Sequence, residues 1–102
     1  MDTNIPVEKL IDIKVELFGQ ARIIAGCQEI DISVPVNTIV SDIAGILGKK
    51  YPSLIGKVLE NNGSKLLDSY TLNINGKTFV SDGSVGIEPN DIILIFSSQA
   101  GG

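Results

Sequence analysis

The residues with the clearest chemical potential stand at the end of the chain, Gln99-Ala100-Gly101-Gly102. Neither glycine has a Cβ, so a Gly-Gly segment can lie extended inside a channel too narrow for any other dipeptide. At about 3.3 Å per extended residue, residues 97–102 can span roughly 20 Å. We therefore predict that the Gly102 carboxylate is the reactive group and that it enters the active site of a partner protein.

The remaining residue types offer little catalytic chemistry. The chain has no histidine, the commonest general base and metal ligand. Its single cysteine, Cys27, can form neither an internal disulfide nor a thiolate metal cluster. Cys27 has no histidine to activate it, so we interpret it as an ordinary thiol rather than a nucleophile. We expect a protein that is not itself an enzyme, with no metal site and no bound cofactor.

Composition limits the class of protein further. The 102 residues suit a single domain, and a hydrophobic fraction of 43% favours a folded core over disorder. The net charge of −4 argues against nucleic-acid binding, since no basic stripe is present to neutralise phosphates. The longest apolar run, Ile92 to Phe96, is too short to cross a membrane. Because no secretory signal is visible after Met1, we expect a cytoplasmic protein.

Hydrophobic spacing in the first half predicts two strands and one helix. Apolar and polar residues alternate over 11–18 and over 30–34, which is typical of two half-buried antiparallel strands joined by a small-residue connection over 19–26. Helical spacing follows, with Asn37 or Thr38 as the expected cap, at Ile39, Val40, Ile43, Ile46 and Leu47. Residues 54–59 can form a second short helix.

The second half predicts a hairpin and a closing strand. Residues 70–74 alternate, and Asn75-Gly76 suits a type I′ turn that pairs residues 77–80 back onto them. The run Ile92 to Phe96 does not alternate, so we expect a central strand buried on both faces. The predicted fold is α+β, a mixed sheet of four to five strands wrapped around one main helix. We divide the chain into an N-terminal extension (1–10), this domain (11–96) and a flexible tail (97–102).

Several stretches, in order, resemble the MoaD/ThiS family of ubiquitin-like β-grasp sulfur carriers, above all the small subunit of molybdopterin synthase. At the front, Val15-Glu16-Leu17-Phe18-Gly19-Gln20-Ala21-Arg22 with Gly26 is similar to that subunit's Phe-x-x-x-Arg-x-x-x-Gly stretch. Tyr51-Pro52-Ser53-Leu54, Ile74-Asn75-Gly76, Phe96 and Gly101-Gly102 match further segments. The similar stretches run from about Ile13 to Gly102, nearly the whole chain.

The resemblance implies a specific chemistry. An E1-like adenylating enzyme would consume ATP to convert the Gly102 carboxylate into an acyl-adenylate, and a persulfide sulfur donor protein would displace AMP to leave a thiocarboxylate. The tail would then enter the large subunit of molybdopterin synthase and donate its sulfur. Phe96 falls where the family has an interface aromatic residue, and Gly101-Gly102 falls where it has its thiocarboxylated terminus. We predict Phe18, Arg22, Gln99 and Ala100 as further partner-binding residues.

The sequence also departs from this family. Ser97-Ser98-Gln99 stand where two prolines commonly precede the terminal residues, and proline would preset an extended backbone. Three functions therefore stay open. The first is a sulfur carrier for molybdopterin synthesis. The second is a related carrier for thiamin, cysteine or tRNA thiolation, or a ubiquitin-like modifier joined to lysines through Gly102. The third is an interaction domain whose Gly-Gly is incidental.

Overall fold

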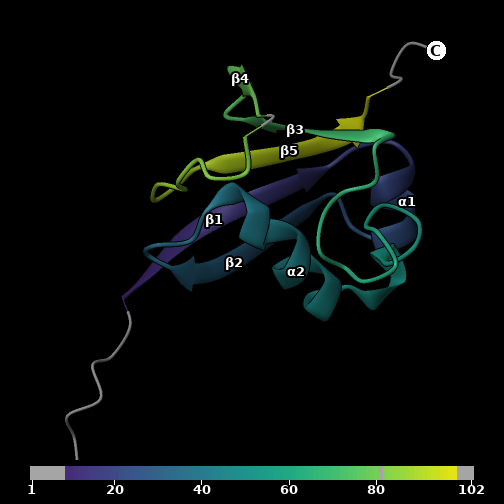
Figure 1. Cartoon of the computed structure of the whole chain (residues 1–102), viewed down its shortest axis with the longest axis horizontal. Coiled ribbons are helices and arrows are strands. Elements are labelled where there is room, and N and C mark those ends of the chain that lie inside the picture. The colour runs from purple at the N-terminus through teal and green to yellow at the C-terminus, as the bar shows by residue number, and fades with distance from the viewer. Residues whose placement is uncertain (1–8, 81, 99–102) are drawn as a thin grey trace, which may run out of the picture.

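The computed structural model of this protein describes residues 9–80 and 82–98. Within these ranges the chain forms one sheet and its covering helices (Figure 1). The elements in chain order are β1 (Leu10–Leu17), α1 (Gln20–Ala25), β2 (Glu29–Pro35), α2 (Val40–Lys50), the 3₁₀ helix η1 (Pro52–Leu54), β3 (Tyr70–Ile74), β4 (Thr78–Phe79) and β5 (Ile92–Ser97). β1 thus begins one residue before the predicted domain and β5 ends one residue after it.

The sheet is mixed, with five strands in the order β2-β1-β5-β3-β4. β5 lies in the centre, parallel to β1 with Leu17 opposite Ile95, and antiparallel to β3 with Leu72 opposite Ile95. β1 and β2 form the predicted antiparallel pair. The hairpin between β3 and β4 turns at Asn75 and Gly76, whose φ angles of 60° and 72° are those of a type I′ turn. The predicted fold class is confirmed.

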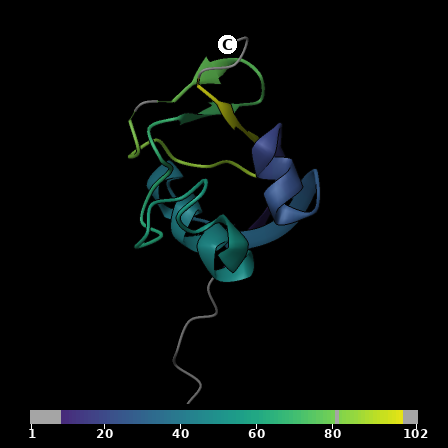
Figure 2. The same cartoon turned by 90° about the vertical axis from the view of Figure 1, so that its right-hand side faces the viewer.

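The core lies between the sheet and α2, which crosses one side of the strands in both views (Figures 1 and 2). Alternate residues of β1, β2 and β5 point into this core, as their period of two requires. β5 differs from its prediction: only Ile93 and Ile95 are fully buried, while Ile92, Leu94 and Phe96 are half-buried. Because α2 covers a single face, these three residues lie on the face that points away from α2, here called the outer face.

Two helical predictions were also wrong in detail. The predicted connection over 19–26 contains α1, which ends at Gly26 in the left-handed region with φ 81°. Helix α2 is capped at Ile39 rather than at Asn37 or Thr38, because the Asp42 carboxylate accepts the Ile39 N–H at 3.0 Å. The α2 cap joins a backbone N–H to a side-chain carboxylate, and its N-cap residue is apolar, so the sequence does not mark it.

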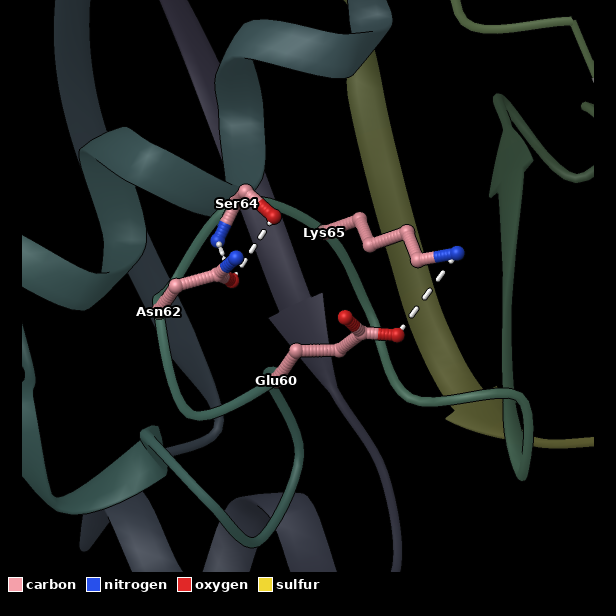
Figure 3. A network of polar contacts seen from close by, with 4 residues as sticks. All are labelled: Glu60, Asn62, Ser64 and Lys65. Carbon is pink, nitrogen blue, oxygen red and sulfur yellow. Dashed lines mark hydrogen bonds and ion pairs between the residues drawn. The ribbon is translucent and has the colours of Figure 1, made fainter.

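The segment after α2 is an ordered loop rather than a second α-helix over 54–59. Its three-residue helix η1 is followed by turns that bury Leu54, Val58 and Leu59 against the core. Further along, the Lys65 ammonium and the Glu60 carboxylate form an ion pair of 3.6 Å (Figure 3). The Asn62 carboxamide oxygen accepts from both the Ser64 N–H and the Ser64 hydroxyl, which tightens the turn between them (Figure 3).

The N-terminus of α2 is closed by the loop that precedes β5. The Val40 N–H donates to the Val85 carbonyl at 2.8 Å, and the Ser41 N–H donates to the Gly83 carbonyl at 2.9 Å. These carbonyls satisfy N–H groups that the first turn of a helix leaves free. No helix among the described residues is long and apolar enough to cross a membrane.

The close approach of this loop to α2 predicts that Gly83→Ala destabilises the fold. A Cβ at residue 83 would lie 2.9 Å from the Ser41 Cβ, too close without a backbone shift. We expect the free energy of unfolding, measured in urea, to fall by about 1–3 kcal/mol. Gly86→Ala is the matched control, because a Cβ there meets nothing within 4 Å. Equal stability of the two variants would contradict this account of the loop.

Candidate functional site

The candidate site begins where β5 ends, at the start of the predicted tail. The Ser98 N–H donates to the Ser69 carbonyl at 2.8 Å, and the Ser98 hydroxyl donates to the Asp68 carbonyl at 3.0 Å. These two bonds tie the last described residue to the segment that enters β3. Gln99, Ala100, Gly101 and Gly102 lie outside the described residues, so the role predicted for them stays a prediction.

Three aromatic rings gather on the outer face beside this exit. The Phe96 ring meets the Phe18 ring edge to face, with centroids 6.2 Å apart and planes at 88°. On its other side it meets the Phe79 ring at 5.8 Å and 67°. Phe79 is 66% exposed, whereas Phe18 and Phe96 are half-buried. The structure therefore brings together the two predicted phenylalanines and adds a third, and we call these three residues the aromatic cluster.

Sheet register explains why these rings meet. Glu16 stands opposite Leu94, so Phe18 and Phe96, each two residues further along parallel strands, lie on the same face. Phe79 stands opposite Asn73, which stands opposite Leu94. Phe79 was not predicted because its place depends on that register. The Asn75-Gly76 turn alone would pair Asn73 with Thr78, but Ile74 stands opposite Thr78, so Lys77 is an extra residue on the return side and brings Phe79 opposite Asn73.

The outer face is acidic beyond the aromatic cluster. Five charged residues of β1 and β2 alternate with their core residues and lie on this face: Asp12, Lys14, Glu16, Glu29 and Asp31. The Lys14 ammonium pairs with the Glu29 carboxylate at 3.4 Å. Glu16 and Glu29 stand directly opposite each other across the ladder, an arrangement of like charges that costs stability. The face thus combines an apolar half with a negative half.

Arg22, the third predicted contact residue on the body, lies on α1. This helix follows β1 and sits at the end of the sheet where β5 also ends (Figure 1). The side chain is exposed and makes no hydrogen bond or ion pair with any residue in the described ranges. Arg22 is therefore near the exit of the tail and available to a partner, but it is not in contact with the aromatic cluster in any described interaction.

Three further polar groups have distinct surroundings, and one of them, Asp82, lines a pocket together with Phe79. Cys27 is half-buried and packs against the core. Its side-chain hydrogen bond with Tyr51, followed by burial, raises the pKa of the Tyr51 phenol. The pKa of the Asp82 carboxyl is lowered, first by the Ser84 hydroxyl and then by the Ser84 N–H. Among the described residues no three His, Cys, Asp or Glu side chains gather into a metal site.

The similarity of this chain to known proteins is found in its structure. No family model and no curated protein sequence matches the chain. SAMP1 of Haloferax volcanii, a small archaeal modifier protein, superimposes with a TM-score of 0.76 at 21% identity, covering 89% of this chain and 99% of that one.

Two further solved structures extend this comparison. Small archaeal modifier protein 1 of Methanosarcina acetivorans has a TM-score of 0.72 at 27% identity, covering 92% of this chain and 99% of its own. A Pyrococcus furiosus protein proposed to be molybdopterin converting factor subunit 1 has a TM-score of 0.70 at 20% identity. The match covers 85% of this chain and 97% of that one. The chain therefore has the ubiquitin-like β-grasp fold, and its structural neighbours include small archaeal modifier proteins and a protein described as a molybdopterin converting factor subunit.

Proposed function

We propose that this protein is a ubiquitin-like carrier whose Gly102 carboxylate is activated by an E1-like adenylating enzyme. The observation that carries the proposal is the Gly101-Gly102 sequence placed just after the central strand of a β-grasp sheet. The neighbours named as modifier proteins and as a molybdopterin converting factor subunit support it, because both names fit a carrier that works through partners.

The proposed chemistry needs no catalytic residue from this chain. A Gly102 carboxylate oxygen attacks the α-phosphorus of ATP and releases pyrophosphate, which leaves a mixed anhydride. A persulfide sulfur on a donor protein attacks the carbonyl carbon and releases AMP, forming an acyl disulfide. A thiol then attacks the sulfur of the donor protein, so that a disulfide forms and the thiocarboxylate leaves on Gly102.

We propose donation of this sulfur to molybdopterin synthesis, with this chain as the small subunit beside a catalytic large subunit. The Phe18, Arg22 and Gly26 spacing and the Ile74-Asn75-Gly76 turn support this choice, since they are the stretches that resemble that subunit. A second candidate is a protein modifier conjugated to lysines through Gly102, or a sulfur carrier for thiamin, cysteine or tRNA thiolation. The neighbours named as small archaeal modifiers favour the modifier among these.

The outer face is the proposed docking surface for these partners. An exposed ring next to two half-buried rings offers apolar contact area at small ordering cost, as binding hot spots do. The aromatic cluster lies beside the end of β5, so a partner that covers it also receives the tail. The negative half of the face favours a partner with a basic surface and speeds the encounter.

The first prediction of this function concerns the mass of the protein. Purified from its native cell, or produced together with its activating enzyme, the intact chain should carry a fraction heavier by the replacement of one oxygen with sulfur at Gly102. Intact mass spectrometry and fragmentation of the C-terminal peptide measure this change and locate the end of the chain. A terminus that stays unmodified under both conditions would contradict the carrier proposal.

Removal of Gly102 separates the two candidate functions. The truncated chain should lose the heavier fraction in either case. Conjugate bands on a denaturing gel that disappear with Gly102 would favour the modifier, whereas copurification of a molybdopterin synthase large subunit without conjugates would favour the sulfur carrier.

The second prediction concerns the exposed ring of the aromatic cluster. Phe79→Ala should weaken binding to the activating enzyme about tenfold or more, because hot-spot truncations cost more than about 1.4 kcal/mol. The free energy of unfolding should change by less than about 1 kcal/mol, since the ring is mostly exposed. Val36→Ala removes another exposed apolar side chain, at the far end of β2, and should leave affinity unchanged. Equal affinities of the two variants would argue against the outer face as the docking surface.

A further inference from the structure

The outer face contains a buried side-chain oxygen that has no hydrogen-bond partner among the described residues. Asn73 is only 5% exposed. Its carboxamide oxygen Oδ1 is inaccessible and has no hydrogen-bond partner among the residues that the structure describes. Buried side-chain oxygens are nearly always paired, and an unpaired one weakens the fold. The presence of this unpaired oxygen in the sheet therefore calls for a physical explanation.

The place of Asn73 in the sheet supplies one. It lies in the same register row as Leu94 on β5 and Phe79 on β4. Phe96, two residues after Leu94, lies on the same face and contacts the Phe79 ring. Asn73 thus stands within the apolar half of the outer face, where a wholly apolar partner would leave its oxygen unpaired. A partner with a donor at that point would satisfy it.

The charges around this position favour a cationic donor. Four of the five charged residues that β1 and β2 place on the outer face are acidic, and only Lys14 is basic. Glu16 lies in the same row as Asn73, two strands away, which is about 10 Å at the usual strand spacing. A positive side chain placed over Asn73 would be attracted by these carboxylates, and a charged donor makes the stronger hydrogen bond.

We propose that the partner covering the outer face presents a lysine or arginine to the Asn73 oxygen, and that Asn73 selects this partner rather than stabilising the fold. This inference rests on the proposed function, because it assumes that the outer face docks an activating enzyme. Access to the oxygen comes from rotation of the Phe79 side chain, which is 66% exposed on an edge strand of two residues. A partner with the cation gains a hydrogen bond to an oxygen that is unpaired in the free protein, whereas a partner without the cation gains none, and this difference in affinity is the selection.

The test uses the full-length chain and the recombinant E1-like adenylating enzyme from the same organism. Asn73→Val replaces the carboxamide with an apolar side chain of similar size that suits a strand, and so removes the oxygen Oδ1. We expect the Kd, measured by calorimetric titration, to rise about tenfold, while the free energy of unfolding of the free chain stays equal or increases. Thr78→Val is the control, since it makes a similar change on neighbouring β4 but on the opposite face, where Thr78 stands opposite Ile74, and its Kd should stay within about twofold.

Asn73→Asp tests the charge of the donor. A carboxylate at this position should bind the enzyme at least as tightly as asparagine does at low salt, and the difference should shrink as salt screens the pair. Wild-type affinity in Asn73→Val would overturn the inference alone, and so would a fall in affinity matched by an equal loss of stability. Absence of both binding and ATP–pyrophosphate exchange with the wild-type chain would instead overturn the proposed function, and the inference with it.

Discussion

The pairing of β5 with both β1 and β3 is the constraint on which the rest of this structure depends. β5 is the last strand in sequence and the middle strand in space, so the sheet is complete only when residues 92–97 lie between two partners. Ile93 and Ile95 are fully buried there, at the centre of the core. A segment that leads directly into the tail is thus held by hydrogen bonds on both edges, which gives the tail a fixed starting point.

The single covering helix has an equally direct consequence for function. With α2 packed on one face, the sheet buries its alternating apolar residues there and leaves the outer face for other contacts. The central strand β5 nevertheless carries Leu94 and Phe96 on that outer face, half-buried by their neighbours. Apolar residues at these positions add little to the core, and their place beside the tail exit is consistent with a surface used for binding.

The sequence predicted the fold well because period and turn chemistry were unambiguous. Alternation located β1, β2 and β3, and Asn75-Gly76 located the turn of the hairpin, although the return strand β4 is shorter than the predicted 77–80 and begins at Thr78. Failures occurred where the local signal was weak. The N-cap of α2 is the apolar residue Ile39, which is not a usual cap, and α1 has only six residues, too few for a clear helical period. The prediction that β5 is buried on both faces failed because an apolar run does not reveal how many layers cover it.

The candidate site was predicted in part for a related reason. Phe18 and Phe96 stand at strand ends near the tail and were found from their positions, whereas Phe79 and Asn73 matter only through the register that brings them beside Leu94. No property of an isolated asparagine indicates that its oxygen will be left without a partner inside a sheet. Groups of this kind are visible only once every donor and acceptor has been followed through the fold.

The start of the tail shows how this chain does without the two prolines that the MoaD/ThiS resemblance implies. Proline would fix the backbone direction at the exit, whereas Ser98 achieves a similar result through two hydrogen bonds to the segment that enters β3. Such bonds lower the entropy lost when a partner orders the chain, because part of the ordering has already occurred in the free protein. Unlike proline, they can also break. Discrimination among partners is then better placed on the outer face, whose rings and buried carboxamide are held by the sheet, than on the short segment that follows.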